Sequence, residues 1–406
     1  MSKQALEGVR VLDMTRYVAG PFCGQLLGDL GAEVIKIEKG VGDTTRAFLP
    51  FAGDSDMSLY FASINRNKKS IQIDYRQEEG MKILKDLIRA SDVIIENFRP
   101  GTMEKMGLGR KELDQINDNI IVVHISGFGQ DGPYKDRAAF DCILEAMSGM
   151  MSITGEENST PMLMGQAYLD FIAGTFGALA AVSALYNRKQ CGGQDIDISM
   201  LEAALSYSLF GPQHYLVNGV ITGQFGNRDR ALSPANTFLA KDDKYVYIHA
   251  GTDQFFEKLC KHMGREDVLQ EGTWNKAAAR MAHPEIPEGI VQEWVSTQRA
   301  ADVEDQMAQL GIPCAVVANM ADVVKNPQLE YRKAFGEVQY PDGLKIPMLN
   351  SNLKMSKTPG RVNLRPPLLG EHSEELLAEI LGMGPEEIQR LEQQHVIGQA
   401  KIAGKN

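Results

Sequence analysis

Asp170 is the residue best suited to chemistry, because it stands alone before a long uncharged stretch. Residues 171–186 read FIAGTFGALAAVSALY and carry no charge. A helix that is apolar on every side is typical of a buried helix, so we expect this one inside a protein core. An aspartate before a helix is commonly its N-cap, where it accepts hydrogen bonds from free N–H groups. A carboxylate is also a nucleophile that can form covalent intermediates, and the local pattern leaves both interpretations open.

This helix is expected to pack closely on a neighbour. Gly174, Gly177 and Ala178 keep one of its sides thin, so another backbone or a flat ligand can lie against it. An alternating strand at 195–199 and a second helix from Met200 follow. Asp170 would then lie at the mouth of a buried helix, where the helix dipole favours an anion.

Two further places are candidate sites in a chain whose net charge is −11. The first group, at 66–76, contains Arg66, Lys68, Lys69 and Arg76. Such a group is usually a solvated face, and the functional alternative is a contact for phosphates. The second place is ENFRPG at 96–101, which follows a predicted strand. Ligands of open parallel sheets bind beyond the carboxyl ends of strands, so this segment is a candidate site.

Length and composition exclude several classes of protein. A chain of 406 residues predicts two domains. The negative charge and the lack of a dense Lys/Arg run argue against nucleic acid as a partner. Neither a signal peptide nor a membrane span is expected, because no suitable apolar run occurs. Five cysteines without a CxxC pair and seven scattered histidines indicate reduced thiols in the cytoplasm and no metal site.

The elements that must position these residues begin with a βαβ unit. A strand at 8–15, a helix at 21–30 and a second strand at 32–39 predict a parallel sheet. Strands at 91–98 and 120–129 and a helix at 77–90 extend it. The fold class is therefore α/β with a parallel, Rossmann-like sheet. The first turn has no GxGxxG sequence, so a redox dinucleotide cofactor is not expected.

The character of the chain changes near residue 208. Residues 208–236 are expected to be irregular, as in a linker or lid. A second unit should end near 325, and strands around 335–355 and two further helices, split by GMGP at 382–385, should complete the chain. The elements predicted for the second unit are a strand at 244–250, helices at 253–263 and 300–310, and a strand at 313–319.

In this order, the motifs resemble those of the class III CoA-transferases, the formyl-CoA/oxalate and carnitine CoA-transferase family, over nearly the whole chain. The segments that carry the resemblance are VRVLDMTRYVAGP at 9–21, GAEVIKIEK at 31–39, the GD and TR pairs at 42–46, NKKSIQID at 67–74, ENFRPG, SGFGQDGPY at 126–134, GGQDIDISMLEAAL at 192–205, GIPCA at 311–315 and PLLGEHSEE at 367–375.

The resemblance implies a large domain from 1–220 and 326–406 and a small inserted α+β domain at 221–325. It further implies an interlocked homodimer and coenzyme A as substrate and product, with no metal or redox cofactor. The family nucleophile matches Asp170. The positions that match coenzyme A contacts are Val18, Ala19, Lys39, Ile73 to Arg76, Asn97, Phe98, Arg99, Lys105, and the segment from Arg137 and Ala138 to Asp141.

Two departures from the family pattern concern the covalent intermediate. Some members carry a glutamine where this chain has Val18, and the family's glycine-rich loop is reduced to AGTDQ at 250–254. The resemblance implies that Asp170 attacks an acyl-CoA thioester, giving an aspartyl anhydride and then an aspartyl-CoA thioester. Backbone N–H groups near Ala250–Thr252 or Phe171–Ile172 are candidate donors to the oxyanion.

Three alternatives remain at this stage. An α-methylacyl-CoA racemase shares the fold, but similar racemases carry His before Asp where this chain has Phe140–Asp141, and Phe cannot move a proton. A coenzyme A-binding protein without chemistry would not need Asp170. A thioester lyase or hydrolase would use water in place of the acceptor acid. The 208–236 stretch and the small domain are expected to line the acyl pocket, and they define no single acid.

Overall fold

The computed structural model describes residues 3–270 and 274–398, which fall into two compact units. The first unit holds Met1–Ser148, Met164–Phe210 and Glu330–Asn406, and the second holds Gly149–Leu163 and Gly211–Leu329. These units differ from the expected domains chiefly at 149–163 and 211–220, which the sequence placed with the large domain.

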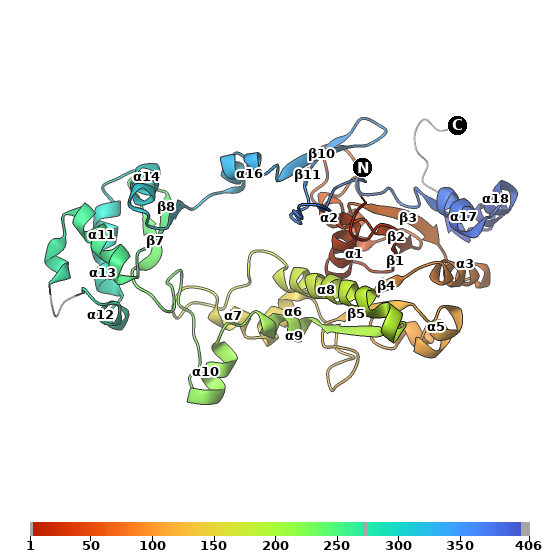
Figure 1. Cartoon of the computed structure of the whole chain (residues 1–406), viewed down its shortest axis with the longest axis horizontal. Helices are drawn as coiled ribbons and strands as arrows, with labels where there is room; N and C mark the ends of the chain where they lie inside the picture. Colours follow the sequence, from red (N-terminus) through yellow and green to blue (C-terminus); the bar gives the residue numbers. More distant parts are fainter. Residues whose placement is uncertain (1–2, 271–273, 399–406) are drawn as a thin grey trace. The chain divides into compact units, whose positions relative to one another are not determined.

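A seven-stranded sheet forms the centre of the first unit, with strand order β12-β3-β2-β1-β4-β5-β6 (Figure 1). The expected α/β class is therefore confirmed. Strands β1 to β6 are parallel, and β12 pairs antiparallel with β3 at one edge of the sheet. The strand order reverses at β1 and β4, where open sheets of this kind bind ligands. The strands are β1 (Arg10–Asp13), β2 (Glu33–Glu38), β3 (Lys68–Ile73), β4 (Val93–Glu96), β5 (Ile121–Ser126), β6 (Asp195–Ser199) and β12 (Ile397–Gly398).

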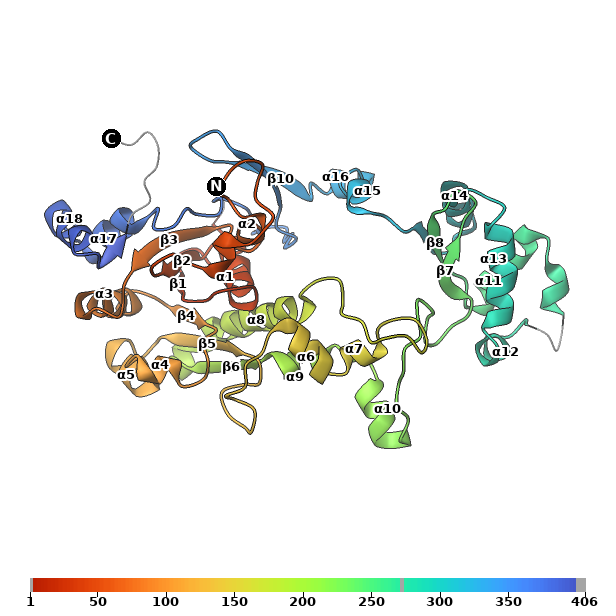
Figure 2. The ribbon, with the colours of Figure 1, turned by 180° about the vertical axis from the view of Figure 1, so that it is seen from behind.

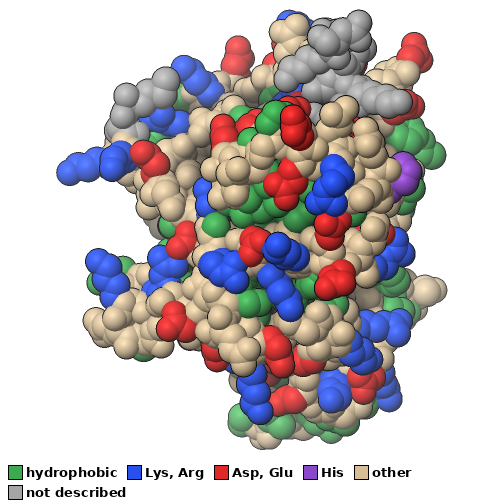
Figure 3. Space-filling model, turned by 90° about the vertical axis from the view of Figure 1, so that its right-hand side faces the viewer, with side chains coloured by type: hydrophobic (Ala, Val, Ile, Leu, Met, Phe, Trp, Pro, Cys, Tyr) green, Lys and Arg blue, Asp and Glu red, His purple; other side chains and the backbone are tan. Residues whose placement is uncertain are grey.

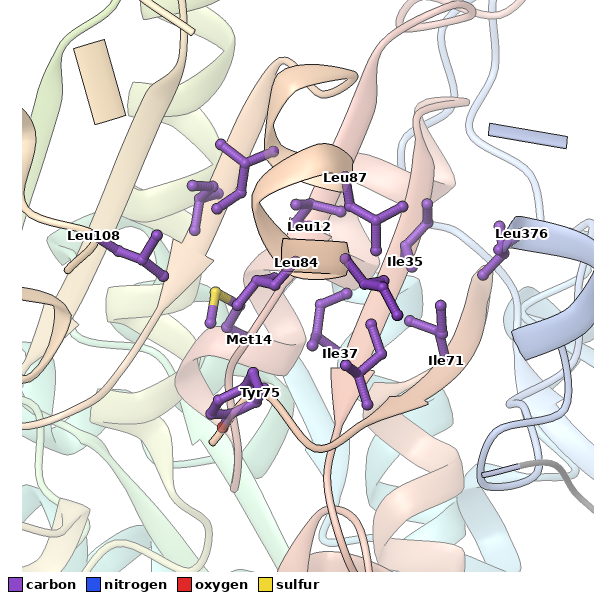
Figure 4. Close-up of a cluster of buried hydrophobic side chains, with 14 of the residues drawn as sticks. Leu12, Met14, Ile35, Ile37, Ile71, Tyr75, Leu84, Leu87, Leu108 and Leu376 are labelled. Atoms are coloured by element: carbon purple, nitrogen blue, oxygen red, sulfur yellow. The ribbon is translucent and has the colours of Figure 1, made fainter. Parts of the chain in front are cut away.

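Alternate residues of each strand face two separate hydrophobic cores, as pleating requires. One core packs the sheet on α3 (Glu78–Arg89), α17 (Ser373–Leu381) and α18 (Pro385–Gln393). Figure 4 shows Leu12 and Ile35 of the sheet opposite Leu84 and Leu87 of α3. The other core packs the sheet on α1 (Ala19–Asp29), α8 (Tyr168–Cys191) and α9 (Met200–Ser206). Figure 2 shows α1 and α8 from the opposite side.

The predicted close approach to α8 is confirmed, and the neighbour is α1. A Cβ atom added to Gly174 would lie 2.5 Å from the carbonyl oxygen of Ala19, and one on Gly177 would lie 3.2 Å from Cys23 Sγ. Residues four apart share one face of a helix, so Asp170 and Gly174 face the same side. The contact at Gly174 therefore brings Asp170 to the N-terminus of α1.

The prediction that α8 is buried on every side is wrong. Leu179 is 61% exposed and Tyr186 is 93% exposed, because only the Gly- and Ala-rich side of α8 meets α1 and the sheet. Among the described residues, α8 is the one helix long and apolar enough to cross a membrane, a test that the core helix of a soluble protein also passes.

The second unit is built on an antiparallel sheet of β7 (Ala235–Leu239), β8 (Tyr245–His249) and β9 (Cys314–Val316). The helices α11 (Asp253–Met263), α13 (Glu285–Val295) and α14 (Ala300–Leu310) accompany it, and the unit has its own core. The prediction of an irregular 208–236 stretch is wrong at α10 (Gly211–Asn218). Pro212 suits the first turn of that helix, a signal the sequence carried.

The strands expected around 335–355 form a hairpin of β10 (Phe335–Gln339) and β11 (Lys345–Leu349). The remaining elements are short: η1 (Thr44–Ala47), α2 (Leu59–Ile64), α4 (Thr102–Lys105), α5 (Arg110–Ile116), α6 (Asp141–Met147), α7 (Met150–Ile153), η2 (Glu266–Leu269), α12 (Ala277–Ala282), α15 (Met320–Val323) and α16 (Pro327–Tyr331).

Substituting Gly174 by alanine should destabilise the protein by about 2 kcal/mol, because the new methyl group would collide with backbone rather than with a flexible side chain. Denaturant unfolding of G174A measures this loss. Gly289 is the matched control, since it also lies within a helix but has open space where its Cβ would be. Equal stability of G174A and G289A would contradict the close-contact argument.

Candidate active site

Asp170 is not the N-cap of its helix. The cap position is Ala167, and Asp170 is the third residue of α8. The free N–H groups of Leu169 and Asp170 donate instead to Oδ1 of Asp141, at 2.8 and 3.2 Å. The local interpretation of Asp170 as a cap is therefore wrong, because a carboxylate distant in sequence takes that position. The carboxylate of Asp170 is left free of this structural duty.

The surroundings of Asp170 disfavour its ionised form. Burial raises its pKa to about 7, and the negative charge of Asp141 acts in the same direction. The N–H of Ala19, in the first turn of α1, donates to the carboxylate and partly offsets these effects. Burial and the charges of Asp170 and Asp141 also raise the pKa of Tyr60, on α2, whose hydroxyl therefore stays a donor. A carboxylate that water stabilises poorly is a stronger base and nucleophile than one in solvent.

The loop from β1 to α1 is fixed by contacts to three other parts of the first unit. Lys36 Nζ donates to the carbonyl of Thr15 at 3.0 Å. The side chain of Asn97 accepts from the N–H of Arg16 at 2.9 Å and donates to its carbonyl at 2.7 Å. Tyr17 has a φ of +65°, which is uncommon for a residue with a side chain, and its N–H donates to Asp43. A loop held at consecutive residues is preorganised.

Buried charges lie beneath this loop. Lys68 Nζ donates to Asp13, to Asn65 and to the carbonyl of Pro21, at 2.7 to 2.8 Å. Burial lowers the pKa of Lys68 to about 8, and although burial opposes ionisation of Asp13, its two lysine neighbours lower its pKa to about 2. Lys36 pairs with Asp43 at 2.9 Å in the same region. These ion pairs anchor the start of α1, which carries the N–H that Asp170 accepts.

Most of the basic group at 66–76 therefore does not offer contacts for phosphates. Lys68 is fully buried, and Arg66 pairs with Asp29 at 2.7 Å. Lys69 pairs with glutamates on β2 and α17. The functional alternative for these three residues is wrong, because each is already paired with carboxylates of the first unit. Arg76, beyond the strand, is exposed and pairs with Asp74.

A cationic cavity lies at the carboxyl ends of β1 to β4. Its volume is about 560 Å³. Burial and the positive charges of Arg16 and Arg76 lower the pKa of Lys39, so the cavity favours an anion. Figure 3, which faces α3 and α5, shows Lys and Arg side chains gathered near the middle of that face among acidic ones. The basic and aromatic residues that line the cavity are Arg16, Lys39, Tyr75, Arg76, Phe98 and Lys105.

The structure brings five of the candidate contact residues to this cavity: Lys39, Tyr75, Arg76, Phe98 and Lys105. Asn97 positions Arg16, Val18 is the N-cap of α1, and Ala19 contacts Asp170 through its N–H. The others are elsewhere. Ile73 is fully buried in the core, Arg99 is exposed beside the cavity, Ala138 is exposed, and Arg137 stacks on Tyr134 at 3.7 Å.

Sequence reasoning missed Arg16 and Tyr60. Arg16 follows the end of β1, so the rule used for ENFRPG would have found it. Tyr60 follows no strand, and no sequence signal pointed to it. The fixed loop joins the cavity to Asp170: Arg16 lines the cavity and Ala19, three residues later, contacts the carboxylate. Three residues span at most about 11 Å.

Two of the candidate oxyanion donors are already occupied. The N–H of Phe171 donates to the carbonyl of Ala167 at 3.3 Å, and that of Ala250 donates to the carbonyl of Pro234 at 2.9 Å. In the second unit, buried Arg280 also donates to the carbonyl of Gly251 at 2.7 Å. The N–H groups of Phe171 and Ala250 are therefore not free to bind an oxyanion.

Comparisons with known proteins agree with this fold. The profile of CoA-transferase family III matches residues 6–373. The chain is 36% identical to succinyl-CoA–D-citramalate CoA-transferase of Chloroflexus aurantiacus, over 97% of this chain and 98% of that protein. It is 34% identical to succinyl-CoA:glutarate CoA-transferase of Homo sapiens, over 93% of this chain and 86% of that protein. A solved CAIB/BAIF family protein from Brucella suis is 32% identical with a TM-score of 0.84, over 94% of this chain and all of that one.

The fold and these similarities define an enzyme that transfers coenzyme A between acyl-CoA and acids. The chain belongs to CoA-transferase family III.

Replacing Asp170 by asparagine should stabilise the folded protein at neutral and alkaline pH. Its pKa rises from 3.8 to about 7 on folding, so the stability that the protonated acid provides is present below pH 3.8 and is lost as the pH rises through 7. At about 1.4 kcal/mol for each pH unit, the advantage of D170N reaches at most about 4 kcal/mol above pH 7. Denaturant unfolding from pH 4 to 8 measures it, with exposed Asp131→Asn as control. A constant difference across that range would contradict the raised pKa.

Proposed function

We propose that this enzyme, acting in the cytoplasm, transfers coenzyme A from an acyl-CoA thioester to a carboxylic acid through a covalent intermediate on Asp170. One observation carries the proposal. A poorly solvated carboxylate with a pKa near 7 lies at one end of a fixed loop whose other end lines a cationic cavity.

In the first half of the reaction, a carboxylate oxygen of Asp170 attacks the thioester carbonyl. The tetrahedral intermediate expels coenzyme A as a thiolate and leaves an aspartyl anhydride. The thiolate then attacks the aspartyl carbonyl, which forms an aspartyl-CoA thioester and releases the first acid. The acceptor acid enters as its carboxylate, and the same steps run in reverse. Every bond broken is replaced by one formed, so no oxidant or metal is needed.

The side chains of the site have separate parts in this scheme. Arg16, Lys39 and Lys105 hold the phosphates of coenzyme A, since Arg and Lys are the usual phosphate-binding side chains. The aromatic rings of Tyr75 and Phe98 offer flat surfaces to the nucleotide base. The thiol arm follows the loop to Asp170. The Tyr60 hydroxyl, which stays protonated beside Asp170, is a candidate donor to the oxyanion.

The donor and acceptor are proposed from the names of similar enzymes. These proteins are named for succinyl-CoA with D-citramalate, L-malate or glutarate. We therefore propose succinyl-CoA as donor and a dicarboxylic acid as acceptor. The racemase alternative gains no support, because Phe140 stands at the position that proton transfer requires and its ring packs against Tyr17.

The proposal includes an interlocked homodimer with the small domain inserted in the large one. Its support is the exposed apolar surface of the first unit, where Leu179 lines an open groove of about 570 Å³ between α8, β6 and α9 and Tyr186 is exposed on the same helix α8. Exposed patches of this kind mark interaction sites. Light scattering on a sizing column gives the mass in solution.

Peptide mass spectrometry tests the covalent step. The enzyme is incubated with succinyl-CoA and a panel of dicarboxylic acids, and hydroxylamine is added to trap activated carboxyl groups. The expected result is a hydroxamate on the peptide that contains Asp170, together with acyl exchange between acids. D170N should form neither. Deuterium incorporation from solvent into Cα of an acyl-CoA, without any adduct, would support the racemase instead.

The rate of trapping should fall as the pH is lowered through 7, because only ionised Asp170 is a nucleophile. At pH 6 the rate should be roughly a tenth of its alkaline limit. Single-turnover trapping across pH 5 to 9 measures it. A midpoint near 4 would show that the carboxylate is not desolvated.

Loss of a cavity lysine should weaken binding of acyl-CoA more than chemistry. K39A and K105A should raise KM roughly tenfold with kcat changed less than about threefold, because one charge-assisted hydrogen bond is lost far from the reacting atoms. Steady-state kinetics with succinyl-CoA measure both constants. Exposed Lys189, near the end of α8, is the matched control, and K189A should change neither. An equal rise in KM for K189A would make the effect one of overall charge.

A further inference from the structure

A second carboxyl group lies behind the active site and has no part in the scheme above. Glu145, on α6, is fully buried with 0% of its surface exposed. Its Oε2 accepts the N–H of Met164 at 2.9 Å. Its Oε1 is also buried, and no N–H or O–H donor of the described residues reaches it. A buried oxygen without a donor costs folding free energy, so the group that lies next to Oε1 should explain how this oxygen is tolerated.

That neighbour is the carboxyl group of Asp141, one helical turn earlier on α6, to which Glu145 is hydrogen-bonded. Two carboxylates cannot donate to one another, so this bond requires one proton between them. Asp141 already accepts two N–H bonds, so its carboxyl group acts here as an acceptor. Glu145 accepts only one, from Met164. The proton therefore belongs to Glu145.

We propose that Glu145 is a positioning residue whose protonated carboxyl donates to Asp141 and thereby fixes the turn of α8 that carries Asp170. This inference rests on the proposed role of Asp170 and adds the residue that holds its helix in place. The path is continuous: Glu145 contacts Asp141, and Asp141 accepts the N–H groups of Leu169 and Asp170.

The charges around Glu145 are consistent with a proton at this position. Burial and then Asp141 raise the pKa of Glu145, while the Met164 N–H lowers it. The elements packed on α6 include α8, which carries Asp170, and α9, which carries exposed Glu202. Among the described residues, no Lys or Arg contributes to the pKa of Glu145 or of Asp170. Ionised Glu145 would add a further negative charge to a group that has no cation to balance it.

Two substitutions separate the donor from the charge. In E145Q, the amide can donate to Asp141 and still accept from Met164, so kcat should stay within about twofold of wild type. In E145L, the volume is kept but the donor is lost, so kcat should fall roughly tenfold, with KM for succinyl-CoA little changed. The matched control is E202Q, on exposed surface of α9, which should change neither constant.

The dependence of activity on pH separates loss of a proton from loss of packing, because a packing defect would not change the shape of the pH profile. Wild-type activity should decline at alkaline pH as Glu145 loses its proton, whereas E145Q, which has none to lose, should keep its activity there. A decline of the same size in both enzymes would overturn the proposal, as would an E145Q variant as impaired as E145L.

Infrared difference spectroscopy tests the proton directly and needs no activity. Wild type minus E145Q, at neutral pH, should show the carbonyl stretch of one protonated carboxylic acid, and wild type minus E202Q should not. Absence of that band would overturn the proposal even if E145L did not fold. A failure of the proposed function is distinct: the band would be present while hydroxylamine trapping at Asp170 failed.

Discussion

The active site depends on how closely α8 approaches α1. Gly174 leaves no side chain between the helices, and the carbonyl oxygen of Ala19 occupies the space that a Cβ atom would need. Since Asp170 lies one turn earlier on the same face, its carboxylate meets the first N–H of α1. A bulkier residue at 174 would separate the N-termini of the two helices and expose the carboxylate of Asp170 to water. Its pKa would then be ordinary, and it would be a weaker nucleophile toward a thioester.

A buried, ionised Asp170 lowers the stability of the folded protein, and contacts in the rest of the site partly offset this loss. The N–H of Ala19 is the polar group that faces it, so the start of α1 must be rigid. Buried pairs of Lys68 with Asp13 and of Lys36 with Asp43 provide that rigidity. Such pairs are weak contributors to overall stability but specify one geometry, because breaking either would leave a charge buried alone.

Negative charge in the site is limited by sharing a proton. Asp141, Glu145 and Asp170 lie on two packed helices, and within the described part of the chain no lysine or arginine lowers the pKa of Glu145 or of Asp170. A protonated Glu145 makes the group tolerable and gives Asp141 a donor on one side and the α8 N–H groups on the other. The cavity at the other end of the β1–α1 loop is positively charged. The loop therefore connects a cavity suited to phosphates with the acidic group that contains the nucleophile Asp170.

The sequence by itself determined the α/β class, the positions of the parallel strands other than β3, the glycines of α8 and the segments at strand ends, because each follows from local periodicity or from turn chemistry. It also ranked Asp170 first. It could not assign the basic residues at 66–76, since whether Lys68 meets solvent or Asp13 depends on a strand pairing with residues far along the chain. The cap of α8, its exposed side and the contact of Ala19 with Asp170 were likewise decided only by tertiary structure, because each joins atoms that lie far apart in sequence.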